Sequence, residues 1–197
     1  MIVKVCGITN PMDALVALDA GADALGFNFW EGSPRYIKDR QFLKDLPDDF
    51  WRVGLFVNED PLKVRDLMQQ YRLDVAQLHK MDSIEGLRVW MAVAADTSLN
   101  QKSLDALNAE AIVVDTPAGA MEGGTGKTFD WNLATGLHGK IVLAGGLDSD
   151  NVGLAIQKLK PWAVDACSRL EEAPGKKDHT KLRAFIEAAR KEFELVC

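Results

Sequence analysis

The chain has 197 residues, of which 47% are hydrophobic and 26% charged, and its formal net charge is −6. This composition is typical of one globular domain with a sizeable core. Its acidity argues against binding to nucleic acid or to acidic membranes, which both require a basic surface. No apolar run reaches the roughly 18 residues of a membrane span. Lys4 and Gly7 interrupt the N-terminal apolar run, so it does not resemble a secretory signal.

The cysteine pattern suits a reducing compartment. Three cysteines are present, an odd number with no CxxC spacing, at Cys6, Cys167 and Cys197. A disulfide framework or a zinc module would need paired cysteines. We therefore expect free thiols and a soluble, cytoplasmic protein.

Short apolar runs alternate with helix-like segments along the whole chain. The runs predicted as strands are residues 2–5, 24–29, 51–57, 75–78, 89–93, 111–115, 140–144 and 162–165. The segments predicted as helices are residues 11–20, 38–46, 61–71, 83–87, 98–107, 130–134, 150–159 and 180–194. Thr9 or Asn10 is expected to cap the first helix, which Pro11 opens, and Ser98 to cap the fifth.

Eight strand-then-helix units of this kind predict a (β/α)₈ barrel. Alternation implies parallel pairing, and strands buried on both faces read as continuous apolar runs. The chain is shorter than the roughly 250 residues typical of this fold, so its loops and its fourth helix, residues 83–87, must be short. The alternative is an open doubly wound sheet, which usually has fewer strands and a glycine-rich first turn. No linker marks a second domain, and residues 1–197 are expected to form one.

Reactive and charged side chains stand at or near the ends of the predicted strands, where barrels build their active sites. They are Cys6, Arg35, His79, Asp115 and Asp165. Cys6 and Asp115 face each other across the predicted mouth and make a general base and general acid pair. Desolvation in an apolar mouth raises the pKa of both groups, so a Cys6 thiolate needs a compensating donor or cation. The alternatives are a small buried hydrophobe for Cys6 and a turn or helix-cap residue for Asp115.

A phosphate site is predicted at the seventh and eighth strands. Barrels often bind phosphate there with loop amides. Gly145 and Gly146 permit close approach of backbone N–H groups, and Ser168 follows the eighth strand with a hydroxyl. The alternative is that Gly145 and Gly146 form only a tight turn.

Other motif-like stretches fail on inspection. Residues 123–128 end like a P-loop, but Met121 stands where the first glycine of that motif belongs, and Phe129 excludes a GxGxxG pattern. Residues 148–159 resemble a calcium loop but place apolar side chains at ligand positions. No metal-ligand spacing relates the three histidines, His79, His138 and His179. We expect neither a metal nor a cofactor.

Six short motifs occur in order over nearly the whole chain. They are residues 4–9 (KVCGIT), 77–79 (QLH), 114–115 (VD), 123–131 (GGTGKTFDW), 143–147 (LAGGL) and 174–179 (PGKKDH). Each is weak alone, but together they closely resemble the phosphoribosylanthranilate isomerase family of tryptophan biosynthesis. The resemblance implies a cofactor-free Amadori rearrangement of a phosphorylated small molecule, N-(5-phosphoribosyl)anthranilate, to 1-(2-carboxyphenylamino)-1-deoxyribulose 5-phosphate.

The same resemblance implies roles for individual residues. Asp115 would protonate the furanose oxygen, and Cys6 would then remove the C2 proton. Arg35 matches the family arginine near the anthranilate carboxylate, and His79 a histidine that positions substrate at the mouth. The residues that match the family's phosphate site are Gly145, Gly146, Asp165 and Ser168.

This chain departs from the family pattern at two places. Lys80 replaces the usual glycine after the histidine, and Cys167-Ser168-Arg169 replaces the usual Ser-Ser-Gly. A histidine-pathway phosphoribosyl isomerase is the alternative enzyme, but it uses aspartate where Cys6 stands. A catalytically silent phosphate-ligand binder is the alternative outside enzymes. We expect a monomer, because no long exposed apolar segment is evident.

Overall fold

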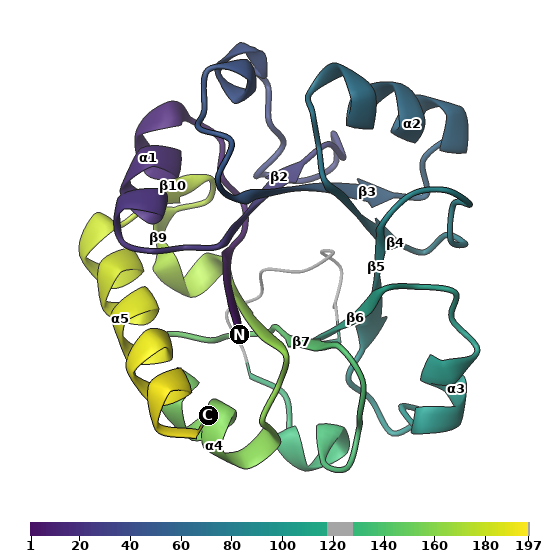
Figure 1. The fold of residues 1–197 in the computed structure, drawn as a ribbon, viewed down its shortest axis with the longest axis vertical. Helices are drawn as coiled ribbons and strands as arrows, with labels where there is room; N and C mark the ends of the chain where they lie inside the picture. The colour runs from purple at the N-terminus through teal and green to yellow at the C-terminus, as the bar shows by residue number, and fades with distance from the viewer. Residues whose placement is uncertain (118–127, 197) are drawn as a thin grey trace.

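Eight parallel strands form a closed barrel in the computed structural model, which describes residues 1–117 and 128–196 (Figure 1). The strands are β1 (Ile2–Val5), β2 (Ala24–Asn28), β3 (Trp51–Val57), β4 (Val75–His79), β5 (Val89–Ala94), β6 (Ala111–Asp115), β7 (Ile141–Leu143) and β8 (Ala163–Ala166). Each strand pairs with the next in sequence, and β1 pairs with β8 to close the ring. The predicted (β/α)₈ barrel is confirmed.

Helices surround the barrel on its outside (Figure 1). The α-helices are α1 (Pro11–Asp19), α2 (Pro61–Gln70), α3 (Gln101–Asp105), α4 (Val152–Leu159) and α5 (His179–Val196). Three 3₁₀ turns, η1 (Gln41–Lys44), η2 (Trp131–Ala134) and η3 (Ser168–Leu170), replace or extend helices. A small antiparallel hairpin of β9 (Glu171–Ala173) and β10 (Lys176–Lys177), which the sequence did not indicate, lies between β8 and α5.

Local hydrogen bonds decide where the helices begin. The side chain of Asn10 accepts the N–H of Asp13 at 2.9 Å, so Asn10 caps α1 and Pro11 opens it. The prediction that Ser98 caps a helix is wrong. Asp96 Oδ1 accepts the Ser98 N–H in a turn, and Asn100 is the residue that caps α3.

Three predicted helices are smaller than expected. Residues 38–46 and 130–134 contain only the 3₁₀ turns η1 and η2, and residues 83–87 form no helix. Gly86 has a φ of +77°, which ends any helical turn in the last of these segments. The fourth crossover is therefore a loop, shorter in structure than the sequence implied.

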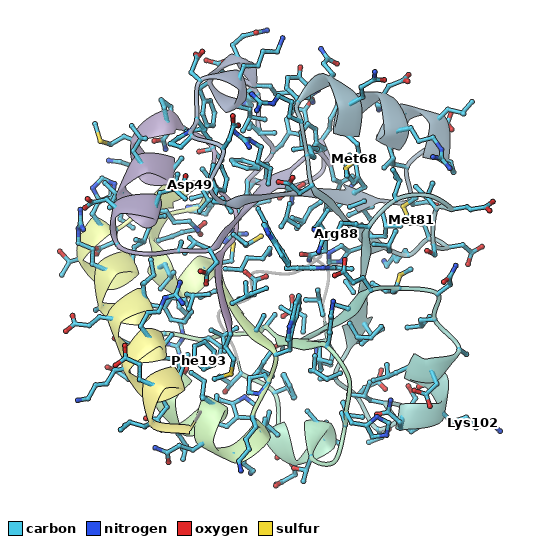
Figure 2. All side chains as sticks on the ribbon, in the orientation of Figure 1. Asp49, Met68, Met81, Arg88, Lys102 and Phe193 are labelled. Carbon is cyan, nitrogen blue, oxygen red and sulfur yellow. The ribbon has the colours of Figure 1, made fainter. Side chains whose placement is uncertain are left out.

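Side chains that alternate along each strand fill two separate apolar layers. The outer layer lies between strands and helices, where Phe193 of α5 packs (Figure 2). The inner layer fills the barrel with residues of the opposite parity, such as Val53, Val75 and Val113. Three tryptophans, Trp51, Trp90 and Trp162, lie at the amino-terminal end of this inner layer, with ring centroids 5.6–6.0 Å apart. They close that end of the barrel.

Candidate functional site

A pocket lies at the carboxyl ends of the strands, and all eight residues predicted from the sequence line it. About 750 Å³ of space, which includes open solvent at the mouth, lies between its lining residues. These lining residues are Cys6, Arg35, His79, Asp115, Gly145, Gly146, Asp165 and Ser168. The barrel topology thus brings together groups that are up to 162 positions apart in sequence (168 minus 6).

Cys6 follows β1 and is buried at the base of the pocket. Its N–H donates to the carbonyl of Ala166 at 2.9 Å, which fixes its backbone beside β8. A Cβ at Gly26 would lie 2.7 Å from its sulfur, so the glycine of β2 leaves the space that the thiol occupies. A hydrogen bond with Cys167 and burial raise the pKa of Cys6, and the Lys4 charge opposes them.

Asp115 ends β6 and faces the same pocket. Burial is the largest cause that raises its pKa to about 6, and the nearby Asp165 charge adds to it. The Thr116 N–H donates to Oδ1 of Asp115 at 2.7 Å and limits the rise. With this pKa, about a tenth of the molecules hold a proton on Asp115 at pH 7, far more than an ordinary aspartate would.

A buried ion pair joins β1 to β8 beneath the two reactive groups. Lys4 Nζ donates to Oδ2 of Asp165 at 2.6 Å, and the two residues face each other in the strand register. Burial opposes the charge on Lys4, but Asp165 outweighs it and raises the pKa of Lys4. Burial raises the pKa of Asp165, with Lys4 opposing. Asp165 Oδ1 has no hydrogen-bond partner among the described residues.

A second buried network lies beside Cys6. Arg35 donates from Nε and Nη2 to the two carboxylate oxygens of Glu171, at 2.8 and 2.7 Å. Lys177 Nζ donates to Glu171 Oε1 and to the carbonyl oxygen of Cys167, both at 3.1 Å. The Arg35 guanidinium is thus fixed by a bidentate pair at the rim of the pocket.

The predicted phosphate side of the pocket begins at the turn after β7. Gly145 and Gly146 have φ values of +86° and +63° after β7. A Cβ at Gly145 would lie 2.8 Å from the Thr116 nitrogen, so glycine is required for this close approach. Ser168 begins η3, and Arg169 reaches across to Asp148, with 3.3 Å between Nε and Oδ2. Arg169 therefore makes an ion pair at the edge of the pocket.

His79 and Gln77 occupy the pocket wall formed by β4. Their side-chain nitrogens, Nε2 of each residue, lie 3.1 Å apart. Lys80, which stands where the family usually has glycine, has a φ of +54°. The backbone therefore keeps the left-handed conformation that a glycine adopts more easily.

Four residues in or beside the site were not predicted from the sequence: the buried Lys4, Glu171 and Lys177, and the half-buried Cys167. Lys4 could have been found, because a charge on the inward-facing parity of an apolar strand requires a partner. Cys167 has the same parity as Asp165 in the eighth strand. Glu171 and Lys177 carried no comparable signal, because their segment has no strand periodicity in the sequence. Only the hairpin of β9 and β10 in the structure shows that these two residues lie beside the site.

Residues 123–127 of the glycine-rich stretch 123–128 lie outside the described residues. Within residues 1–117 and 128–196, no group of three or more His, Cys, Asp or Glu side chains is arranged to hold a metal ion. No described helix is long and apolar enough to span a membrane.

Comparison with known proteins gives the site a family. The model of the family "N-(5'phosphoribosyl)anthranilate (PRA) isomerase" matches residues 3–188. The N-(5'-phosphoribosyl)anthranilate isomerase of Solibacter usitatus is 44% identical over 194 residues, which cover 96% of this chain and 98% of that protein.

Solved structures agree with this match. The crystal structure of phosphoribosyl anthranilate isomerase from Thermotoga maritima is 39% identical and covers 97% of this chain and 100% of its own, with a TM-score of 0.87. Monomers made from that dimeric enzyme match with 38% identity, the same coverage and a TM-score of 0.80. An isomerase in complex with reduced 1-(o-carboxyphenylamino)-1-deoxyribulose 5-phosphate is 38% identical, with the same coverage and a TM-score of 0.81.

The closed parallel barrel, with its polar pocket at the carboxyl ends of the strands, defines the class: a (β/α)₈-barrel enzyme. The extent and identity of the matches define the family. The chain belongs to the N-(5'-phosphoribosyl)anthranilate isomerases, the isomerases of tryptophan biosynthesis.

Proposed function

We propose that this chain catalyses the Amadori rearrangement of N-(5-phosphoribosyl)anthranilate, with Asp115 as general acid and Cys6 as general base. The observation that carries the proposal is that both side chains face one pocket from β6 and from the end of β1. Asp115 is partly buried, with a pKa of about 6, and the Lys4 charge near the buried Cys6 favours its thiolate. The substrate assignment follows from the family.

The reaction uses each group in turn. Asp115 gives its proton to the furanose ring oxygen, and the ring opens to a Schiff base between C1 and the anthranilate nitrogen. Cys6 then takes the C2 proton, and the electron pair of that C–H bond forms the enolamine. Tautomerisation of the enol at C2 gives the ketone, with a proton added at C1. No metal or cofactor enters any step.

The rest of the pocket binds the substrate. We assign Arg35 to the anthranilate carboxylate, since its bidentate pair with Glu171 fixes the plane of the guanidinium. We assign His79 to positioning, with Gln77 holding its ring. In the order of the strands around the barrel, both contacts lie across from the glycines that follow β7.

The phosphate is assigned to the turn after β7 and to the hydroxyl of Ser168. Gly145 and Gly146 have positive φ values, and consecutive N–H groups in such a turn are suited to bind an anion. Asp165 is an anion and repels phosphate, so we assign it, together with Lys4, to holding β8 at this side of the pocket. Arg169 adds a cation at the pocket edge, paired with Asp148.

We also propose that the chain is a monomer in the cytoplasm. The support for the location is the presence of two free thiols, Cys6 and Cys167, in one pocket, which a reducing compartment maintains. The Thermotoga maritima relative is described as dimeric. Sedimentation of this chain at the assay concentration measures its oligomeric state.

A steady-state assay with freshly generated phosphoribosylanthranilate tests the proposal. We expect turnover by the intact chain, and loss of turnover in Cys6→Ala and Asp115→Ala while both variants keep the circular dichroism of the barrel. Turnover retained in either folded variant contradicts its assigned role. Analogue binding without turnover by the intact chain indicates a silent binder, and turnover of the aminoimidazole carboxamide substrate indicates the histidine-pathway reaction.

A further inference from the structure

Two thiols lie side by side at the base of the pocket. The strand register sets Val5 of β1 beside Ala166 of β8, and Cys6 donates its N–H to the Ala166 carbonyl. The next residues along the two strands are therefore the neighbours Cys6 and Cys167, and both line the pocket. Gly7 and Gly26 leave room for the sulfurs: a Cβ at either would lie 2.8 or 2.7 Å from one of them.

The charges around this thiol pair are not balanced. The groups that interact with one or both sulfurs are three cations and two carboxylates: Lys4, Arg35, Lys177, Asp165 and Glu171. All five are buried, with at most 9% of their surface exposed. If all five are ionised, three cations against two carboxylates leave one positive charge, as long as Asp115 in the same pocket is protonated. One thiolate shared by the two cysteines neutralises it, and this reduces the cost of burying the group.

The local contacts place that negative charge on Cys167. Lys177 Nζ lies 3.9 Å from its sulfur, while Glu171 Oε1 lies 4.0 Å away and opposes the charge. The hydrogen bond from Cys6 is the largest cause that lowers the pKa of Cys167, to about 7, and the charges of Lys177 and Arg35 contribute. The same hydrogen bond raises the pKa of Cys6. Asp115 and His79 face the pair from the other side of the pocket.

This arrangement presents a chemical difficulty for Cys6. A base must lose its own proton before or while it accepts another, yet Cys6 is the thiol of the pair that holds the proton. Cys167 is the neighbouring residue across the strand pair, and its pKa of about 7 means that about half of the molecules carry the Cys167 thiolate at pH 7. Cys167 therefore carries the negative charge, while Cys6, the base, still holds the single proton that the two sulfurs share.

We propose that Cys167 acts through Cys6 as a positioning residue that receives the Cys6 thiol proton while Cys6 removes the substrate C2 proton. The inference rests on the proposed role of Cys6. Before the step, Cys6 is a thiol and Cys167 a thiolate; after it, both are neutral thiols. The electron pair of the C2–H bond forms the C1–C2 double bond of the enolamine, and the Schiff-base nitrogen loses its positive charge.

The return step restores every proton. Cys6 donates its proton to C1 as the enol becomes the ketone, and Cys167 returns its proton to Cys6. The enol hydroxyl proton goes to the Asp115 carboxylate, which regenerates the acid. The thiol pair thus begins and ends each turnover with one negative charge.

Cysteine suits this role and serine does not. The Cys167→Ser change preserves a small side chain that accepts a hydrogen bond. An alcohol, however, does not hold a negative charge near neutral pH, whereas an ordinary thiol ionises with a pKa of about 8.5. The charge must then be held by Cys6 alone. The variant therefore removes the proton transfer to residue 167 while it keeps the shape of the pocket.

The first experiment is the pH dependence of kcat/KM for the intact chain, Cys167→Ser and Cys167→Ala. We expect the acid limb, near pH 7 in the intact chain, to move up by about one unit in both variants, with about a tenfold loss of kcat/KM at pH 7. A loss of rate with no movement of the limb would mean a structural role only. An unchanged profile would also overturn the relay.

A second measurement does not depend on turnover. The ultraviolet absorbance of thiolate is titrated in the folded intact chain, in Cys167→Ser and in Cys6→Ser, and iodoacetamide labelling at pH 7 is mapped to peptides. We expect a thiolate transition near pH 7 that Cys167→Ser abolishes and Cys6→Ser retains. Labelling of Cys6 in preference to Cys167 would overturn the inference, even if a Cys167 variant failed to fold.

Failure of the proposed role of Cys6 and failure of the proton relay through Cys167 give different results. Turnover in Cys6→Ala would contradict the proposed base, and the thiolate titration of the intact chain would still test whether Cys167 holds the charge. An inactive Cys6→Ala, combined with an unmoved limb in Cys167→Ser, would contradict the relay alone.

Discussion

The two ends of the barrel interior carry opposite kinds of side chain. At the amino-terminal end, Trp51, Trp90 and Trp162 pack ring against ring. At the carboxyl end, the buried Lys4–Asp165 pair lies beneath the pocket. One end is filled and apolar, and the other contains groups whose charges are costly to bury. Side chains that stabilise the fold therefore lie at one end of the barrel, and side chains that could carry out chemistry lie at the other.

The apolar end is covered by cations that pack on its rings. The Arg88 guanidinium lies 4.4 Å from the Trp51 ring centroid, and Figure 2 shows Arg88 over the barrel interior. Lys140 Nζ lies 5.1 Å from the Trp162 ring centroid. Both cations also bind Glu110, at 2.7 and 2.8 Å. These charges are partly exposed, so their contribution to stability is small beside that of the buried rings.

The largest expected effect is on catalysis at the polar end. Asp115→Asn keeps the size of the side chain but removes the proton that it donates. We expect kcat to fall by about 10²–10⁴-fold, the usual contribution of a general acid. The assay is steady-state turnover, with thermal unfolding as the control for folding. A kcat within a few-fold of the intact chain would remove Asp115 from the mechanism.

A charge removed from the polar end should also cost stability. Lys4→Met leaves the Asp165 carboxylate buried without its cation, and we expect a loss of about 3–5 kcal/mol in the free energy of unfolding. Urea unfolding measures it. The matched control is Lys4→Met with Asp165→Leu, which removes both charges and should recover most of the loss. If the double variant is as unstable as the single one, packing of the lysine stem and not charge is responsible.

At the apolar end the expected loss is in stability alone. Trp90→Ala removes a fully buried ring and should cost about 3–5 kcal/mol. Trp90→Phe is the milder control, because the indole N–H of Trp90 has no partner among the described residues. We expect kcat of the folded Trp90→Phe protein to match that of the intact chain. A large change in kcat would show that the two ends are coupled.

The raised pKa of Asp115 predicts how stability depends on pH. Its folded pKa, about 6, lies above the unfolded value of 3.8, so the folded state binds more protons between these values. This group's contribution is therefore lost as pH rises from about 4 to about 6, by about 2–3 kcal/mol. Urea unfolding over this range in the intact chain and Asp115→Asn isolates the effect. Equal slopes would contradict it.

The smallest effect lies outside the barrel and serves as a reference. Asn100→Ala removes the cap of α3 and should cost about 1 kcal/mol. Ser98→Ala, two residues earlier, should change the free energy of unfolding by only a few tenths, since Ser98 takes part in an exposed turn with Asp96. Activity should be unchanged in both. A larger loss of stability in Ser98→Ala than in Asn100→Ala would mean that Ser98 is the helix cap after all.

Sequence reasoning found most strands because each is a short apolar run between turn signals. It found the pocket residues because their side chains stand where those runs end. It did not find interactions that depend on tertiary placement, such as the Arg35–Glu171 pair. It also misplaced the start of α3, since Ser98 and Asn100 are both good caps and only the Asp96 turn decides between them.

Pairing of β1 with β8 has a consequence for how the chain folds. Ribosomes add about 5–20 residues per second, so the open edge of β1 remains without its final partner until almost the whole chain has emerged. Contacts of such long sequence separation are slow to form. Cys6 is synthesised at the start and Cys167 near the end. The thiol pair therefore exists only once the ring is closed, and a partly made chain has a sheet edge but no assembled site.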